Sequence, residues 1–247
     1  KQRWLPKMIS GEIVGALAMT EPSGGSDVQA LKTKAVKDGN VYRLSGQKTF
    51  ITNGQHANLI IVAAKTNPEE KAKGMSLIVL ETDGAEGFQR GRNLDKIGLK
   101  AGDTSELFFD NIAIPPENLL GGEEGQGFYQ MMKQLPQERL IIGCGAVGAM
   151  EGAVSRTIQY CKEREAFGGP LIQFQNTRFK LAEVKTKTTV SRAFLDECIT
   201  EHLHGNLTVE KAAMAKYWLT DTQGEVIDEC LQLHGGYGYM QEYDLSL

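Results

Sequence analysis

Two segments early in the chain carry more hydroxyl and amide groups than folding alone requires. Residues 19–28 read Met-Thr-Glu-Pro-Ser-Gly-Gly-Ser-Asp-Val and could offer N–H and O–H donors to a polar heterocycle. In residues 48–54, Phe50 precedes Thr52 by two positions, so on a strand both side chains share one face. A ring and a hydroxyl on one face suit stacking against a second ring and bonding to its edge. The structural alternatives are a surface turn and a strand that ends in an Asn-Gly turn.

Two later segments could hold phosphate groups. Residues 163–168 read Glu-Arg-Glu-Ala-Phe-Gly, so the end of a helix would combine Arg164 with Phe167, and Gln175 follows on the next helix. The guanidinium fork of arginine binds diphosphates well. Residues 232–239 form a glycine-rich loop whose backbone could approach the phosphates of a ligand. A plain interhelical stop and a plain helix C-cap remain the alternatives.

Residues 143–148 fit the pattern G-x-G-x-x-G, which is found in nicotinamide-dinucleotide sites. Such a site requires a βαβ unit with a second strand that carries the ribose-binding acid. The sequence shows no such strand, and the apolar residues 140–142 continue the helical spacing that begins at Met131. We therefore interpret these glycines as helical positions that let a neighbouring helix or a ligand approach closely.

The first half of the chain reads as an all-β unit. Turn residues recur at short intervals between positions 13 and 120, and β-rich runs separate them. The clearest hairpin places Asp38-Gly39-Asn40 between the alternating segments 32–36 and 41–44. Further β-rich runs lie at residues 59–64, 75–81 and 107–109. This pattern predicts an antiparallel β-barrel or sandwich.

The second half of the chain has helical spacing with few breakers. It predicts helices over residues 128–163, with a kink near Pro136, over 174–204 and over 208–233, and residues 1–10 read as a short helix. Thr208 is placed to cap the last of the long helices. The expected fold class is therefore α+β with more than one domain, in which the β unit is followed by an antiparallel helical bundle.

Composition excludes several functional classes. The chain has 247 residues, 27 Lys+Arg against 31 Asp+Glu and a formal net charge of −4, so no basic field attracts nucleic acid or an anionic membrane. No apolar run approaches the roughly 18 residues of a membrane span. Four widely separated cysteines, without a C-x-x-C pair, argue against a metal site and a disulfide framework and suit a reducing compartment. The cysteines are Cys144, Cys161, Cys198 and Cys230.

Taken together and in order, these motifs resemble the acyl-CoA dehydrogenase family along the whole chain. The matching segments are residues 19–27, 50–54, 103–105, 109–111, 164–168 and 232–238. A family member has an N-terminal helical domain, a middle β-domain and a C-terminal four-helix bundle. The resemblance implies that residues 1–12 end an N-terminal helical domain missing from this chain. Residues 13–122 would form the middle β-domain, which binds flavin and acyl-CoA, and residues 123–247 a truncated C-terminal bundle.

The resemblance also implies an FAD site. Leu17, Met19, Thr20 and Ser26 would touch the flavin and its pyrimidine edge, with Phe50 and Thr52 against the isoalloxazine. The family often has tryptophan at the position of Phe50. The residues that would reach the FAD of a neighbouring subunit are Arg164, Phe167, Gln175, Gln232 and Gly236. A cofactor site shared between subunits implies a homo-oligomer, usually a tetramer.

Family chemistry is the α,β-dehydrogenation of an acyl-CoA thioester to a trans-2-enoyl-CoA, as in fatty acid β-oxidation. A glutamate takes the α-proton as hydride leaves the β carbon for flavin N5. Most members carry that glutamate after the Gly-Tyr-Gly loop, in a segment absent here. The long-chain and isovaleryl types place it on the first long helix, before Arg-Leu, and this implies Glu138 as the base, with Arg139 and Ser26 at the substrate. A solvated helix glutamate is the alternative.

The resemblance further implies long or branched acyl substrates and electron-transfer flavoprotein as the acceptor. The enzyme would be cytoplasmic in a bacterium and in the mitochondrial matrix of a eukaryote. Two alternatives remain. A related acyl-CoA oxidase would let oxygen reach the reduced flavin, and the chain could also be a non-catalytic assembly fragment.

Overall fold

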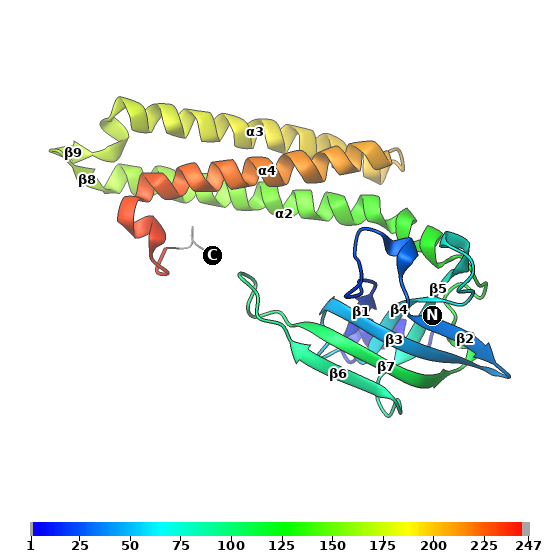
Figure 1. Cartoon of the computed structure of the whole chain (residues 1–247). Coiled ribbons are helices and arrows are strands. Elements are labelled where there is room, and N and C mark those ends of the chain that lie inside the picture. Colours follow the sequence, from blue (N-terminus) through cyan, green and yellow to red (C-terminus); the bar gives the residue numbers. More distant parts are fainter. Residues whose placement is uncertain (1, 244–247) are drawn as a thin grey trace. The chain divides into compact units, whose positions relative to one another are not determined.

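A computed structural model describes residues 2–243, and the chain divides into two compact units, Lys1–Met132 and Lys133–Leu247. The described part of the first unit has a short helix, α1 (Leu5–Ser10), and a curled seven-stranded sheet (Figure 1). The strands are β1 (Gly15–Ala18), β2 (Lys34–Asp38), β3 (Val41–Thr52), β4 (Leu59–Lys65), β5 (Met75–Glu81), β6 (Phe88–Asn93) and β7 (Thr104–Ile114). Short 3₁₀ turns lie at Val28–Ala30, Ala72–Gly74 and Pro116–Asn118.

The sheet is mixed rather than purely antiparallel. Its strand order is β1-β4-β2-β3-β7-β6, with β5 paired to the other edge of β4. Most ladders are antiparallel, but β1 runs parallel to β4, with Gly15 opposite Leu59. Parallel neighbours need a long connection, and here that connection contains the whole β2–β3 hairpin. Local alternation predicts strands but not this pairing.

The predicted β2–β3 hairpin is confirmed. Asp38 pairs with Val41, which leaves Gly39 and Asn40 as a two-residue loop. Gly39 has a φ of 58°, in the left-handed region that such tight loops require. Inward residues of the neighbouring strands, among them Leu44, Leu107 and Phe109, are buried in the core of this unit. The alternation read from the sequence therefore sets the inner and outer faces of the sheet.

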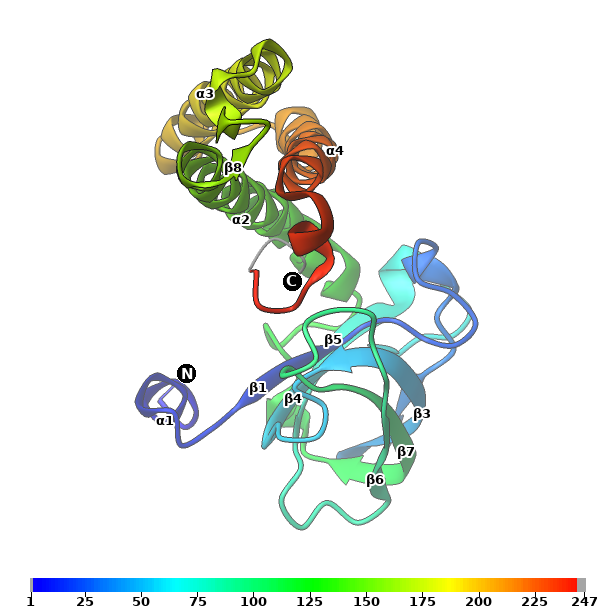
Figure 2. The ribbon, with the colours of Figure 1, turned by 90° about the vertical axis from the view of Figure 1, so that its left-hand side faces the viewer.

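Three long helices run side by side through the described part of the second unit (Figure 1). They are α2 (Gly127–Glu163), α3 (Gln175–Leu203) and α4 (Val209–His234), and α2 begins within the first unit. Figure 2 views these helices closer to end-on. Each contributes aliphatic residues to a shared core, such as Val147, Leu195 and Leu219. The predicted α+β fold class and its antiparallel bundle are confirmed, and α2 continues through Pro136.

The G-x-G-x-x-G segment lies inside α2, as the sequence indicated, and not between a strand and a helix. A Cβ at Gly143 would lie 2.9 Å from Cδ1 of Leu219, so this glycine lets α2 and α4 pack closely. Gly145 and Gly148 have no heavy atom within 4 Å of a built Cβ. The three glycines therefore serve different purposes, and only Gly143 is required by packing within the bundle.

Thr208 caps α4, as predicted. Its side chain accepts a hydrogen bond from the backbone N–H of Lys211 at 3.1 Å. We expect Thr208→Ala to lower the free energy of unfolding by about 1 kcal/mol, because a first-turn N–H loses its acceptor. Thr189→Ala is the matched control, since the Thr189 hydroxyl only donates back to Lys185 O inside α3. Urea denaturation measures both, and equal losses in the two variants would contradict the capping role.

Candidate functional site

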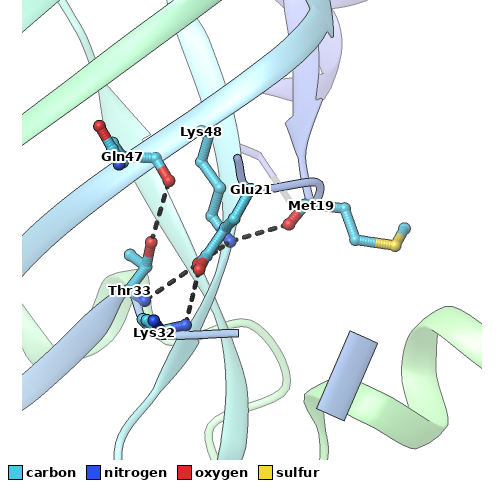
Figure 3. Close-up of polar contacts among 6 residues, drawn as sticks. All are labelled: Met19, Glu21, Lys32, Thr33, Gln47 and Lys48. Atoms are coloured by element: carbon cyan, nitrogen blue, oxygen red, sulfur yellow. Dashed lines mark hydrogen bonds and ion pairs between the residues drawn. The ribbon is translucent and has the colours of Figure 1, made fainter. Parts of the chain in front are cut away.

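A buried ion pair holds the loop of residues 19–33 against β3. Glu21 and Lys48 are 5% and 1% exposed, and Lys48 Nζ lies 2.9 Å from Glu21 Oε1 (Figure 3). The ammonium also donates to Met19 O at 2.9 Å. The carboxylate accepts the backbone N–H groups of Lys32 at 2.6 Å and Thr33 at 3.0 Å. The pair thus fastens both ends of this loop to one strand.

The hydrogen bonds of Glu21 decide its ionisation. Burial by itself raises the pKa of the Glu21 carboxyl, but hydrogen bonds from Thr33 and Lys32 and the charge of Lys48 hold the pKa below its ordinary value. Loss of water lowers the pKa of Lys48, and the Glu21 carboxylate offsets this only in part. Glu21 therefore stays ionised at neutral pH and acts as the fixed acceptor around which the loop is ordered.

The structure brings together the two segments that the sequence assigned to a flavin. Thr49 N donates to Thr20 O at 2.9 Å, and Asn53 Nδ2 donates to Gly15 O at 3.1 Å. These bonds tie the end of β3 to the segment that carries Leu17, Met19 and Thr20. Leu17 is 40% exposed, so its side chain remains available to a ligand. Ser26 lies exposed on the loop that the ion pair fastens.

Phe50 occupies a strained position between these bonds. The β3–β7 register shifts between Lys48 and Ile51, and Phe50 has a φ of 60°. The left-handed region costs a bulky residue on the order of 1–2 kcal/mol. The ring is nevertheless 66% exposed, and Thr52 is exposed as well. Strain that leaves an aromatic side chain in solvent is typical of a binding position.

The segment after α2 forms a tight hairpin that the sequence did not predict. β8 (Glu165–Ala166) pairs with β9 (Gly169–Pro170), and a 3₁₀ turn, Leu171–Gln173, follows. Phe167 and Gly168 form the two-residue loop with φ values of 52° and 86°, as type I′ turns require. Phe167 is 97% exposed at its tip. A phenylalanine in the left-handed region gives no hairpin signal, so the sequence suggested only an interhelical stop.

Arg164 and the glycine-rich loop after α4 share a cleft of about 560 Å³. Both Gln232 and Gly236 line it, and the guanidinium carbon of Arg164 lies 5.4 Å from the centre of the Tyr237 ring. The loop is a 3₁₀ turn, Gly235–Tyr239, and nothing lies within 4 Å of a built Cβ at Gly236. Gln175, by contrast, begins α3 and is not among the residues that line this cleft.

Tyr160 and His234 also line this cleft, and the sequence pattern had indicated a role for neither. Their rings stack with centres 4.1 Å apart, and the Tyr160 hydroxyl donates to His234 O at 3.3 Å. The His234 side chain is buried, with Nδ1 2.9 Å from Cys230 O. Burial raises the pKa of the Tyr160 hydroxyl, and the positive charge of Arg164 partly opposes this. Their contact links α2 to the start of the glycine turn.

Glu138 and Arg139 lie on α2 in the second unit, whereas the residues assigned to the flavin ring lie in the first. Glu138 is exposed and Arg139 is half-buried. Among residues 2–243, no ion pair engages the Glu138 carboxylate.

The described part of the chain holds no group of three or more His, Cys, Asp or Glu side chains arranged to bind a metal ion. None of its helices is both long enough and apolar enough to cross a membrane.

Comparisons with known proteins cover nearly the whole chain. A family model described as "Acyl-CoA dehydrogenase, middle domain" matches residues 16–112, and one described as "Acyl-CoA dehydrogenase, C-terminal domain" matches residues 125–247. Mitochondrial long-chain specific acyl-CoA dehydrogenase from Sus scrofa is 48% identical over 247 residues, which is 99% of this chain and 57% of that protein. Mitochondrial isovaleryl-CoA dehydrogenase from Oryza sativa subsp. japonica is 39% identical over 243 residues. That match covers 98% of this chain and 58% of that protein.

Among solved structures, acyl-CoA dehydrogenase from Geobacillus kaustophilus superposes with a TM-score of 0.96 at 51% identity. The match covers 100% of this chain and 65% of that one. The chain thus spans less than two thirds of the length of each of these three proteins.

The buried ion pair gives a testable energy. We expect Glu21→Gln to lower the free energy of unfolding by about 3–5 kcal/mol, because the Lys48 ammonium would stay buried without its carboxylate. The exposed pair between Glu106 and Arg92 is the matched control, and Glu106→Gln should cost less than about 1 kcal/mol. Replacing both charges, in Glu21→Gln/Lys48→Met, should recover most of the loss. Similar urea midpoints for Glu21→Gln and Glu106→Gln would refute the anchoring role.

The lowered pKa of Glu21 also predicts how stability depends on pH. The ionised carboxylate contributes stability above the unfolded value near pH 4.3, and the contribution is lost as pH falls through the lower folded pKa. Urea midpoints measured from pH 7 to pH 3 should therefore fall more steeply for the wild type than for Glu21→Gln. Parallel curves would show that Glu21 does not titrate with unfolding.

Proposed function

Because this chain belongs to the acyl-CoA dehydrogenase family, we propose that it carries the flavin-binding β-domain and the catalytic helix of an FAD-dependent acyl-CoA dehydrogenase. Members of this family are flavoproteins that act on CH–CH donors. One observation carries the proposal: the hydrogen bonds between residues 15–20 and 49–53 place an exposed, strained Phe50 beside the Met19-Thr20 segment. Residues 13–122 would form the middle domain and 123–247 the C-terminal bundle, after the end of an N-terminal domain at 1–12.

The chemistry of the donor set fits FAD. Phe50 offers a ring face, and Thr52, Thr20 and Ser26 offer hydroxyl and backbone groups to a polar ring edge, with Leu17 and Met19 alongside. Arg164 and the open glycine turn at Gly236 suit a diphosphate. When bound, FAD would supply the acceptor for the hydride that leaves the substrate's β carbon.

Glu138 would be the base that removes the α-proton of the acyl thioester. Such a proton is too weakly acidic for a carboxylate in water, but removal of water strengthens the base and hydrogen bonds to the thioester oxygen stabilise the developing negative charge. Glu138 is exposed on α2, so its carboxylate is accessible to a substrate. Arg139 and Ser26 would orient the CoA part of the substrate.

The exposed hairpin of the second unit supports an oligomer in which subunits share the cofactor. Phe167 is almost fully exposed at the tip of a two-residue turn, which leaves its ring available to a neighbouring subunit. Together with Arg164, Gln175, Gln232 and Gly236, it would contact the FAD of a neighbouring subunit. A homotetramer is the arrangement that we propose.

The relatives suggest the substrate and the setting. Long-chain and isovaleryl-CoA dehydrogenases are among them, so we propose long or branched acyl-CoA substrates of fatty acid β-oxidation. Electron-transfer flavoprotein would be the acceptor. Two of the relatives are described as mitochondrial. The enzyme would therefore work in the mitochondrial matrix of a eukaryote, or in the cytoplasm of a bacterium.

Substitution of the proposed base tests the mechanism. In the full-length protein, Glu138→Gln should retain bound FAD but lose acyl-CoA oxidation by about three orders of magnitude or more, since general-base catalysis contributes roughly 10²–10⁴-fold. Glu210→Gln is the matched control, because Glu210 is an exposed glutamate on α4 that is assigned to no site. Turnover by Glu138→Gln near the wild-type rate would show that Glu138 is not the base.

The electron acceptor separates the proposal from the oxidase and assembly alternatives. The reduced enzyme should be reoxidised much faster by electron-transfer flavoprotein than by dissolved oxygen, and stopped-flow absorbance of the flavin measures both rates. Faster reoxidation by oxygen would favour an acyl-CoA oxidase. A purified full-length protein without flavin absorbance would favour a non-catalytic assembly role.

A further inference from the structure

The outer face of the sheet carries a row of three exposed side chains that the proposed function does not use. Gln47 of β3 lies opposite Phe108 of β7, and Phe108 lies opposite Gln89 of β6. Directly paired residues share a face, with Cβ atoms about 4.5–5.5 Å apart. The row therefore places one amide on each side of a ring. The next residue, Phe109, points inward and is buried, so Phe108 is on the outer face through normal alternation.

The Phe108 ring packs over a glycine. A Cβ built on Gly91, two residues beyond Gln89 on β6, would lie 2.7 Å from Cε2 of Phe108. The ring therefore leans over the bare backbone of Gly91, where a larger residue would displace it. Phe108 remains 38% exposed in this position. One side of the ring packs on the sheet, and the other is left to solvent as a flat apolar surface.

The row of Gln47, Phe108 and Gln89 lines a cleft of about 780 Å³. Ser23 and Lys32, from the loop that the Glu21–Lys48 pair fastens, line it as well. Among residues 2–243, no carboxylate lies within salt-bridge distance of the Lys32 ammonium. The cleft thus combines a ring face, two amides that each donate and accept, a hydroxyl and an uncommitted positive charge.

We propose that this cleft binds the adenine ring of a nucleotide. Aromatic side chains stack on nucleobases, and glutamine amides can donate and accept together at the N6 and N7 positions of adenine. Lys32, on the β3 side of the row, would meet a phosphate. The nucleotide could be free, or it could be the adenosine end of a CoA ester, because both present the same ring and phosphate. The site lies wholly within the first unit and uses none of the residues assigned to flavin or catalysis except through the shared loop.

The test is isothermal titration calorimetry of ADP binding to the full-length, FAD-loaded protein after unbound FAD has been removed. The flavin sites are then occupied, and no free FAD competes with ADP through its own adenine ring. The wild type should bind ADP at least about tenfold more tightly than ribose 5-phosphate, which lacks the base. Phe108→Leu should weaken ADP binding about tenfold and leave the ribose 5-phosphate affinity unchanged, whereas Phe108→Tyr should bind ADP as the wild type does. Gln47→Leu/Gln89→Leu should also weaken ADP binding.

Phe179→Leu is the matched control, because Phe179 is an exposed phenylalanine on α3, in the other unit. A parallel titration with CoA distinguishes the two sources of the ring. If Phe108→Leu weakens CoA as well as ADP, the adenosine end of CoA occupies the cleft, and if it weakens ADP alone, a free nucleotide does. The proposal is overturned if the wild type binds ADP no better than ribose 5-phosphate, or if Phe108→Leu and Phe179→Leu bind ADP equally well. None of these readouts depends on acyl-CoA oxidation, so they stand whether or not Glu138 is the base.

Discussion

The carboxylate of Glu21 and the ammonium of Lys48 are both removed from water, and the arrangement of the first unit follows from their pairing. A buried charge without a partner is very costly, so the loop that carries Glu21 has to pack against β3, where Lys48 supplies the opposite charge. That packing brings Met19 and Thr20 to the strand that bears Phe50. It also brings Lys32 to the wall of the outer cleft. One desolvated contact thereby positions both the proposed flavin edge and the proposed nucleotide cleft.

Phe50 and Phe167 show a second common constraint. Both are phenylalanines with positive φ, and both are largely exposed, so neither conformation is explained by burial of the ring within its own unit. In each case short-range pairing enforces the backbone: the bulge of β3 at Phe50 and the β8–β9 ladder at Phe167. Because the surrounding pairing already fixes the backbone, an exposed ring can meet a ligand or another subunit without a further loss of backbone entropy.

Short-range signals predicted most of the elements. Helical spacing located α2, α3 and α4 to within a residue or two, and Thr208 marked the start of α4 because capping depends on residues only three positions apart. The hairpin at Gly39 and Asn40 was predicted from its turn residues in the same way. The parallel pairing of β1 with β4 was not, because the forty residues between them contain a complete hairpin. The turn at Phe167 was also missed, since its sequence contradicts the usual preference for small residues with positive φ.

Periodicity and residue types at short spacing indicated the fold class, and the order of the motifs carried the resemblance to the family. The contacts of Lys48 with Glu21, of Tyr160 with His234 and of Phe108 with the backbone of Gly91 emerge only when the chain is folded. Each of these contacts joins residues at least 17 positions apart in the sequence. Burial of the two charges is offset only because they meet each other, and the rings gain by packing away from water. A linear pattern cannot show which distant groups will meet in this way.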